Sequence, residues 1–75
     1  MGPTHHHPPQ TPMATRQQLE DQLGRCEEAI LDTIRSKLNA ELTYNSELFQ
    51  RTTARLHALQ VLEKQLHAAW RRTPR

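Results

Sequence analysis

The sequence predicts an all-α protein built on one long amphipathic helix, at about residues 15–72, that packs into a coiled-coil or helical-bundle assembly. Between Thr15 and Thr73 there is no proline and only one glycine, Gly24. Leu, Gln, Glu, Arg and Ala dominate this stretch, and all five favour helices. Apolar residues recur in it every three or four positions, which is the spacing of one helix face.

The first fourteen residues differ from the rest of the chain. They hold four of the five prolines and a run of three histidines, and they contain no Asp, Glu, Lys or Arg. Proline disrupts helix interiors because its ring clashes with the preceding turn and its nitrogen carries no hydrogen. We therefore expect a disordered Pro/His-rich arm at 1–14, an amphipathic helical interaction segment at 15–73 and a short tail at 74–75.

Both ends of the expected helix carry recognisable signals. Thr15 is followed three residues later by Gln18, the pattern of a capping box, in which each side chain accepts from the backbone N–H of the other residue. Arg71 and Arg72 suit the negative end of a helix dipole, and Pro74 cannot continue a helix. These signals place the helix between about residue 15 and residue 72.

The apolar residues form one stripe along this helix. The average step along it is about 3.64 residues, close to the 3.6 residues of a helical turn. A strict heptad would average 3.5 residues, so we expect a nearly straight helix and no supercoiled seam. The apolar members, which we expect to form the partner interface, are Leu19, Leu23, Cys26, Ile30, Ile34, Leu38, Leu42, Phe49, Leu56, Leu59, Leu62, Leu66 and Trp70.

Two polar residues, Asn45 and Thr52, interrupt the stripe. A polar residue inside a helical seam can fix the register and the oligomeric state at some cost in stability. We therefore assign register or specificity roles to both. The alternative is that they face solvent near a break in the helix.

A helical hairpin is the alternative fold. Residues 43–46 read Thr-Tyr-Asn-Ser, all mediocre helix formers, and a turn there would fold one half of the stripe onto the other. Charge favours such antiparallel pairing, since residues 15–50 carry a net charge of −3 and residues 51–75 a net charge of +5. Against the hairpin, the segment holds neither Gly nor Pro, and the apolar phase runs through it without a slip.

A helix of this kind exposes its stripe unless another surface covers it. Apolar residues make up 35% of the chain, below the roughly 45–50% of a typical soluble domain, so a compact monomeric core is not expected. Burying one Leu or Ile side chain contributes roughly 1.5–3 kcal/mol, whereas helix propensity alone rarely holds such a segment together. We therefore expect other helical subunits to supply the missing surface, in a hetero-oligomer or, alternatively, a homo-oligomer.

The residues predict neither an enzyme nor a cofactor site. The two glycines lie too far apart to form a phosphate-binding loop. Cys26 lies in the apolar stripe, where we expect a buried and inert thiol. His5, His6 and His7 can bind a metal only weakly because no acid or thiol accompanies them, so no functional metal site is expected.

These observations favour a structural protein–protein interaction subunit that packs its apolar stripe into a multi-subunit helical assembly, of the cytoskeletal, kinetochore, tethering or transcription type. One alternative is a self-associating antiparallel coiled-coil spacer. Another is a basic accessory factor contacting nucleic acid, which we favour less because the basic residues are dispersed. No apolar run is long enough to cross a bilayer, and a single cysteine allows no internal disulfide. We therefore expect an intracellular protein, cytoplasmic or nuclear.

Overall fold

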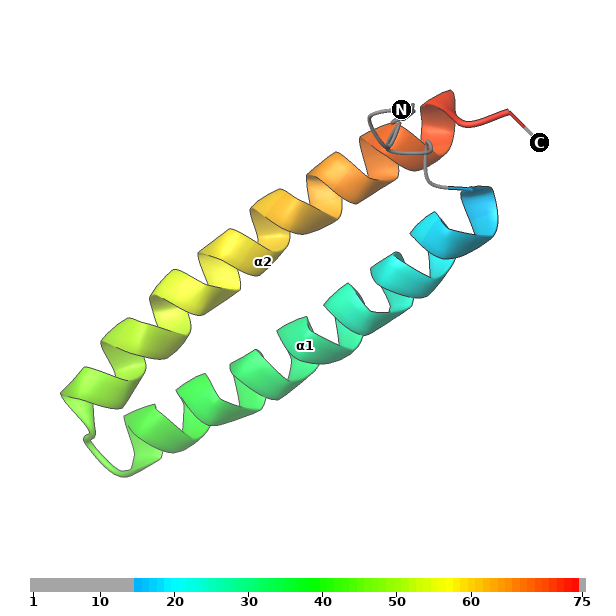
Figure 1. Ribbon diagram of the computed structural model, residues 1–75. Coiled ribbons are helices and arrows are strands. Elements are labelled where there is room, and N and C mark those ends of the chain that lie inside the picture. Colours follow the sequence, from blue (N-terminus) through cyan, green and yellow to red (C-terminus); the bar gives the residue numbers. More distant parts are fainter. Residues whose placement is uncertain (1–14, 75) are drawn as a thin grey trace, which may run out of the picture.

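The computed structural model describes residues 15–74, and these form two antiparallel helices joined by a short turn (Figure 1). Helix α1 spans Arg16–Leu42 and helix α2 spans Ser46–Arg72. The expectation of one continuous helix over 15–72 is therefore wrong, and the alternative of a hairpin with a turn near 43–46 is confirmed. The arm expected at 1–14 lies outside the described residues.

The turn forms without glycine or proline because the hydrogen bonds and backbone conformations of three residues end α1 and start α2. Thr43 donates to the Asn39 carbonyl through both its backbone N–H (3.0 Å) and its hydroxyl (2.8 Å). Tyr44 then adopts a left-handed backbone conformation, with φ of 54°. Asn45 N–H donates to the Ala40 carbonyl at 2.9 Å, and the Asn45 side chain accepts from Leu48 N–H at 3.0 Å.

Asn45 is therefore the N-cap of α2. Its side-chain oxygen satisfies one of the backbone N–H groups that the first turn of a helix leaves without a partner. This explains why a polar residue interrupts the apolar pattern at this position. A break in periodicity and a helix start look alike when a polar residue serves as the cap.

The predicted capping box at the start of α1 is confirmed. Thr15 N–H donates to the Gln18 side chain at 2.9 Å, and Gln18 N–H donates to the Thr15 hydroxyl at 3.1 Å. Helix α2 ends at Arg72, where Thr73 N–H donates to the Trp70 carbonyl at 3.2 Å. The two ends of the hairpin thus lie where the sequence placed the two ends of a single helix.

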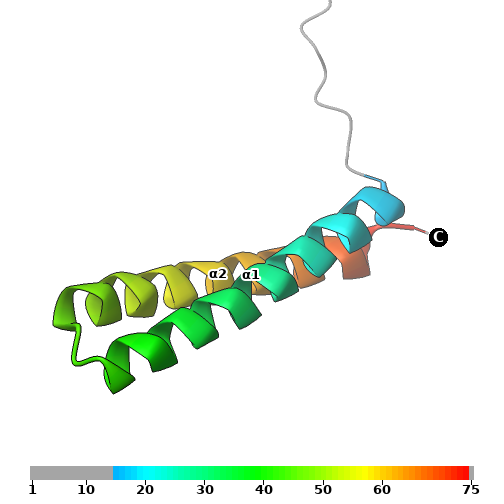
Figure 2. The same ribbon diagram turned by 90° about the horizontal axis from the view of Figure 1, so that it is seen from below.

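The two helices bury a seam that follows a strict heptad repeat, with alternating steps of three and four residues. A spacing of 3.5 residues keeps a seam facing its neighbour only when two helices wind around each other, and Figure 2 shows α1 and α2 crossing obliquely. The straight, non-heptad stripe expected from the sequence is therefore wrong for the buried contact. The seam consists of Leu19, Leu23, Cys26, Ile30, Thr33, Lys37 and Ala40 in α1 and Phe49, Thr52, Leu56, Leu59, Glu63, Leu66 and Trp70 in α2.

The apolar core occupies only the open half of the hairpin, near the two chain ends. Leu19, Leu23, Cys26 and Leu66 are buried there, and Ile30, Leu59, Ala69 and Trp70 pack against them. Toward the turn the seam holds Thr33, Lys37, Ala40 and Thr52, which are small or polar, and Phe49 and Leu56, which are only half-buried. The half near the turn therefore contributes less apolar burial to the fold.

Candidate interaction surface

The outer side of α1 near the turn carries four large apolar side chains that the hairpin leaves uncovered. Leu31 is 58% exposed, Ile34 38%, Leu38 53% and Leu42 80%. We call these four residues the α1 stripe. They line up along the helix, since they are three or four residues apart.

A mismatch between two periods puts these residues outside the seam. From Ile30 to Leu42 the apolar pattern advances by four residues per step, whereas the seam advances by an average of 3.5. Up to Ile30 the two patterns coincide. Beyond it the seam passes to Thr33, Lys37 and Ala40, and the apolar residues rotate out of the contact between the helices. The hairpin thus buries the first half of the apolar pattern of α1 and exposes the second.

The expected interface residues divide into groups according to this geometry. The structure brings some of them together in the core and leaves others open. The hairpin itself buries Leu19, Leu23, Cys26 and Leu66, packs Ile30, Leu59 and Trp70 against them, half-covers Phe49 and Leu56, and leaves Ile34, Leu38, Leu42 and Leu62 exposed.

Two buried seam residues, Thr33 and Ala40, lie outside the predicted interface set and are 4% and 1% exposed. The Thr33 hydroxyl donates to the Ala29 carbonyl at 2.7 Å, so its polar group is satisfied within its own helix. Continuing the heptad that starts at Leu19 would have found both positions. The larger apolar residues beside them fit the apolar periodicity and are therefore assigned to the predicted interface in their place.

Asn45 and Thr52, expected to set register, both make hydrogen bonds inside the hairpin. Asn45 caps α2. The Thr52 hydroxyl donates to the Leu48 carbonyl at 2.8 Å, and the Phe49 carbonyl also lies at 3.0 Å. Thr52 is buried in the seam, so it is part of the contact between the two helices. Their role in register between chains stays a prediction.

The hairpin has two long sides, one on either flank of the seam. Glu20 and Glu27 of α1 line a shallow groove with His67 of α2 on one flank. Ile34 follows Glu27 by seven residues, or two helical turns, so it lies on this same flank, with Leu31 and Leu38 in the next row outward. We call this flank the stripe side. The opposite flank, the back side, has grooves lined by Arg25, Ala29 and Leu62 and by Asp32, Ser36 and Arg55.

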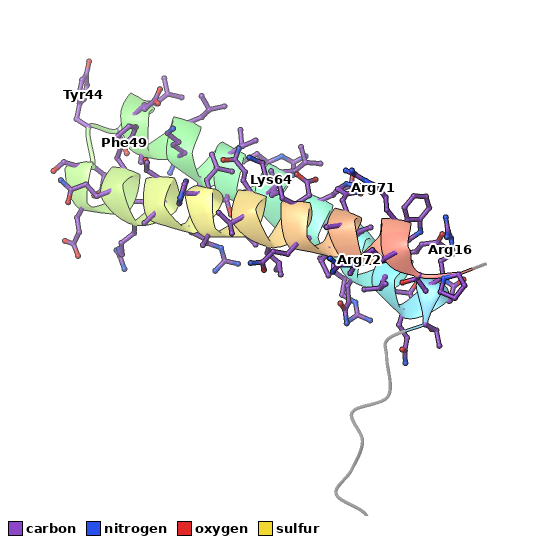
Figure 3. The ribbon with its side chains drawn as sticks, turned by 90° about the horizontal axis from the view of Figure 1, so that it is seen from above. Arg16, Tyr44, Phe49, Lys64, Arg71 and Arg72 are labelled. Atoms are coloured by element: carbon purple, nitrogen blue, oxygen red, sulfur yellow. The ribbon has the colours of Figure 1, made fainter. Side chains whose placement is uncertain are left out.

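Charge divides between the helices, but the ion pairs do not join them. The three ion pairs within residues 15–74 are Arg16–Glu20, Arg35–Asp32 and Arg51–Glu47, each inside one helix. Figure 3 shows Lys64 and Arg71 projecting from one edge of α2 and Arg72 from the other. The basic residues of α2 are thus spread over two sides.

A cluster of polar contacts closes the open end of the hairpin. Trp70 Nε1–H donates to Glu20 Oε2 at 3.0 Å, and the Arg16 guanidinium donates to the Thr73 carbonyl at 3.1 Å. Arg16 also stacks over the Trp70 ring, 3.9 Å from its centroid. These contacts link the first turn of α1 to the last turn of α2.

Cys26 is buried in the seam, where its thiol donates to the Leu59 carbonyl at 3.4 Å. Burial raises the pKa of the Cys26 thiol, and the negative charges of Glu63 and Glu27 raise it further. A thiol with a raised pKa stays protonated at neutral pH and is a poor nucleophile. This environment suits a packing role.

Within residues 15–74, no group of three or more His, Cys, Asp or Glu side chains is arranged to hold a metal ion. His5, His6 and His7 lie outside the described residues. Neither α1 nor α2 has the length of apolar sequence needed to cross a membrane. No protein family, curated protein or solved structure matches this chain.

Proposed function

We propose that this protein is a structural interaction subunit, whose hairpin packs the α1 stripe against partner helices in a multi-helix bundle. The observation that carries the proposal is the exposure of Leu31, Ile34, Leu38 and Leu42 in a continuous row after the hairpin has formed. A continuous row of exposed apolar side chains marks a protein contact, whereas single exposed apolar residues do not.

The energetics of the hairpin support the same proposal. Two helices bury a single seam, and toward the turn the α1 side of this seam is polar or small, at Thr33, Lys37 and Ala40. Burying the four side chains of the α1 stripe in a bundle would contribute on the order of 5 kcal/mol, given their present partial exposure. That contribution is comparable with the whole stability of many small domains. The partners are therefore expected to be helices with a complementary apolar face.

An accessory role on nucleic acid has less support. Phosphate binding needs Lys and Arg gathered on one surface, whereas Lys64 and Arg71 lie on one edge of α2 and Arg72 on the other (Figure 3). Salt separates the two functions. Phosphate-driven binding weakens steeply as salt rises, and apolar helix packing does not.

The experiment replaces the stripe without touching the seam. In the full-length chain, Leu38→Asp combined with Leu42→Asp should abolish assembly, measured as molar mass by light scattering after size exclusion. Ser36→Asp combined with Asn39→Asp is the matched control, since both residues are exposed and lie in the same turns of α1 on another face. Circular dichroism should show that both variants keep their helices. Assembly that survives the stripe variant would contradict the proposal.

A further inference from the structure

Contacts within the hairpin do not explain two residue types, a glycine inside α1 and a tyrosine at the left-handed position of the turn, and these two residues lie beyond opposite ends of the α1 stripe. Gly24 lies inside the first half of α1 at an exposed position, although glycine destabilises a helix interior by roughly 1 kcal/mol relative to alanine. A Cβ atom at Gly24 would meet nothing within 4 Å. Packing between α1 and α2 therefore does not require a glycine here.

Tyr44 is the second feature. Its backbone φ of 54° is a conformation that side chains other than Gly, Asn and Asp disfavour. Tyr44 is 94% exposed, so its side chain makes no extensive contact within the hairpin that would favour a tyrosine at this position. Figure 3 shows Tyr44 projecting away from the turn at the same edge as Lys64 and Arg71.

That edge is the stripe side. Lys64 and Arg71 lie three and four residues from His67, which lines the groove with Glu20 and Glu27. Gly24 falls in the same row as Leu31 and Leu38 because each step is seven residues, two helical turns. The stripe side thus carries the protruding side chain of Tyr44 near one end and Gly24, which has no side chain, near the other. The α1 stripe lies between these two residues.

The spacing of the two features makes this side complementary to itself. Gly24 and Tyr44 are each ten residues from Ile34. A two-fold axis passing beside Ile34 and perpendicular to α1 would therefore place Tyr44 of each chain level with Gly24 of the other. Interfaces built on such an axis use the same patch on both chains. In this arrangement Leu31, Ile34 and Leu38 of one chain meet the same residues of the other, and Leu42 comes level with position 26 of the other copy, close to its Gly24.

We infer that a second copy of this chain covers the α1 stripe, with the two α1 helices antiparallel and Tyr44 of each copy seated over Gly24 of the other. This inference rests on the proposed function and names the partner for it. The protruding ring needs a site without a side chain, and Gly24 provides one. The result is a four-helix contact over the turn halves of the two hairpins.

The polar surroundings of the stripe fit a second copy. On the stripe side of α2, the turn half presents Gln50, Thr53, His57 and Gln60, all exposed and without Asp, Glu, Lys or Arg. Two copies of α2 can therefore approach over this half without pairing like charges. An unfavourable feature is that Glu27 comes level with Glu41 of the other copy, so added salt should strengthen the association.

The first test is a pair of glutamine substitutions in the full-length chain, studied by sedimentation across a range of concentrations. Gly24→Gln should weaken dimerisation by about tenfold or more, because the new side chain fills the site of Tyr44. The same substitution should raise the thermal stability of the diluted monomer, since glutamine favours a helix and meets open space. Ser36→Gln, on the back side, should leave the dimerisation constant unchanged.

Tyr44→Gly tests the other half of the contact. It should weaken dimerisation as much as Gly24→Gln does, and the double variant should be little weaker than either single one, because both changes remove the same contact. A monomeric wild-type chain at the highest concentrations would overturn the inference. So would a dimer whose constant is unaffected by both single substitutions.

A cross-link gives a direct geometric test. In a Cys26→Ala background, Gly24→Cys combined with Tyr44→Cys places two thiols roughly 30 Å apart in one chain, too far for an internal disulfide. Mild oxidation should nevertheless give a covalent dimer. Ser36→Cys combined with Tyr44→Cys is the control and should stay largely uncross-linked. Equal cross-linking in both variants would overturn the inference.

These results separate the inference from the proposed function. If the chain is monomeric, or dimerises through another surface, the second copy is excluded as the occupant of the stripe. A different result would contradict the proposed function, namely that the combined Leu38→Asp and Leu42→Asp substitutions leave every assembly of the chain intact.

Discussion

Arg16 and Trp70, 54 positions apart in the sequence, stack at the open end of the hairpin, with the guanidinium carbon 3.9 Å from the ring centroid. The contact is reinforced on both sides. Arg16 donates to the Thr73 carbonyl, and the indole N–H of Trp70 donates to Glu20. The first residue of α1 is thereby fixed to the last turn of α2, where fraying would otherwise begin.

Arg16→Lys should lower the free energy of unfolding by about 1 kcal/mol, because lysine lacks the planar group that stacks on the ring while bonding to a carbonyl. Urea denaturation followed by circular dichroism measures this loss. Arg35→Lys is the control, since the Arg35–Asp32 pair is exposed and contributes little. Equal losses in the two variants would show that the stacking contact does not stabilise the hairpin.

Asn45→Ala should destabilise the hairpin by about 1 kcal/mol through loss of the α2 N-cap. Asn45→Asp keeps a side-chain oxygen that accepts from Leu48 N–H and should retain most of the stability. The two variants can be compared by thermal denaturation. Equal destabilisation by Ala and Asp would contradict the capping role.

Tyr44→Gly should stabilise the isolated hairpin by about 1 kcal/mol, because glycine adopts the left-handed conformation of this position without strain. Thr43→Gly is the matched control. Thr43 has φ of −99°, so glycine there only adds flexibility and removes the hydroxyl bond to Asn39. Denaturation must be measured at dilutions where the chain is monomeric. A loss of stability in Tyr44→Gly would mean that the ring supports the turn.

Cys26 gives a prediction about pH. Its pKa is raised above the ordinary value of 9.0 by burial, with Glu63 and Glu27 adding to the effect. The fold therefore favours the protonated thiol. The resulting stabilisation is present below pH 9 and is lost as the pH rises through the pKa of the folded state.

The stability advantage of the wild type over Cys26→Ala should accordingly shrink in alkaline solution. Denaturation of both proteins from neutral pH to above pH 10 measures this difference, and groups common to both cancel. The thiol should also react slowly with iodoacetamide until the chain is unfolded. A constant difference across the pH range, together with rapid alkylation of the folded protein, would contradict this account.

Local signals in the sequence predicted much of the fold. The capping box at Thr15 and the end of the second helix near Arg72 follow from short-range chemistry, and both are confirmed. The sequence predicts the turn only as an alternative, because the turn uses Tyr44 in a left-handed conformation where glycine is the usual signal. A tyrosine in the sequence does not predict a left-handed backbone conformation.

The apolar periodicity of the sequence alone does not show which apolar residues the hairpin buries and which it leaves exposed. Leu31, Ile34 and Leu38 fit the average period of the apolar pattern, and only the position of the second helix decides which residues face it. Once α2 lies against the seam, Thr33 and Ala40 become buried and the larger residues beside them become exposed. The difference between the seam's average step of 3.5 residues and the four-residue steps of the apolar pattern after Ile30 therefore determines which residues remain for a partner.

The central claim is that the α1 stripe is open in one chain and covered in the assembly, and thiol reactivity tests it most directly. In a Cys26→Ala background, Leu38→Cys should be alkylated rapidly in dilute protein and progressively more slowly as the protein concentration rises. Asn39→Cys, an exposed neighbour that points away from the stripe, should react at one rate throughout. If the thiol at position 38 reacts equally fast at every concentration at which the chain is assembled, the stripe is not the interface.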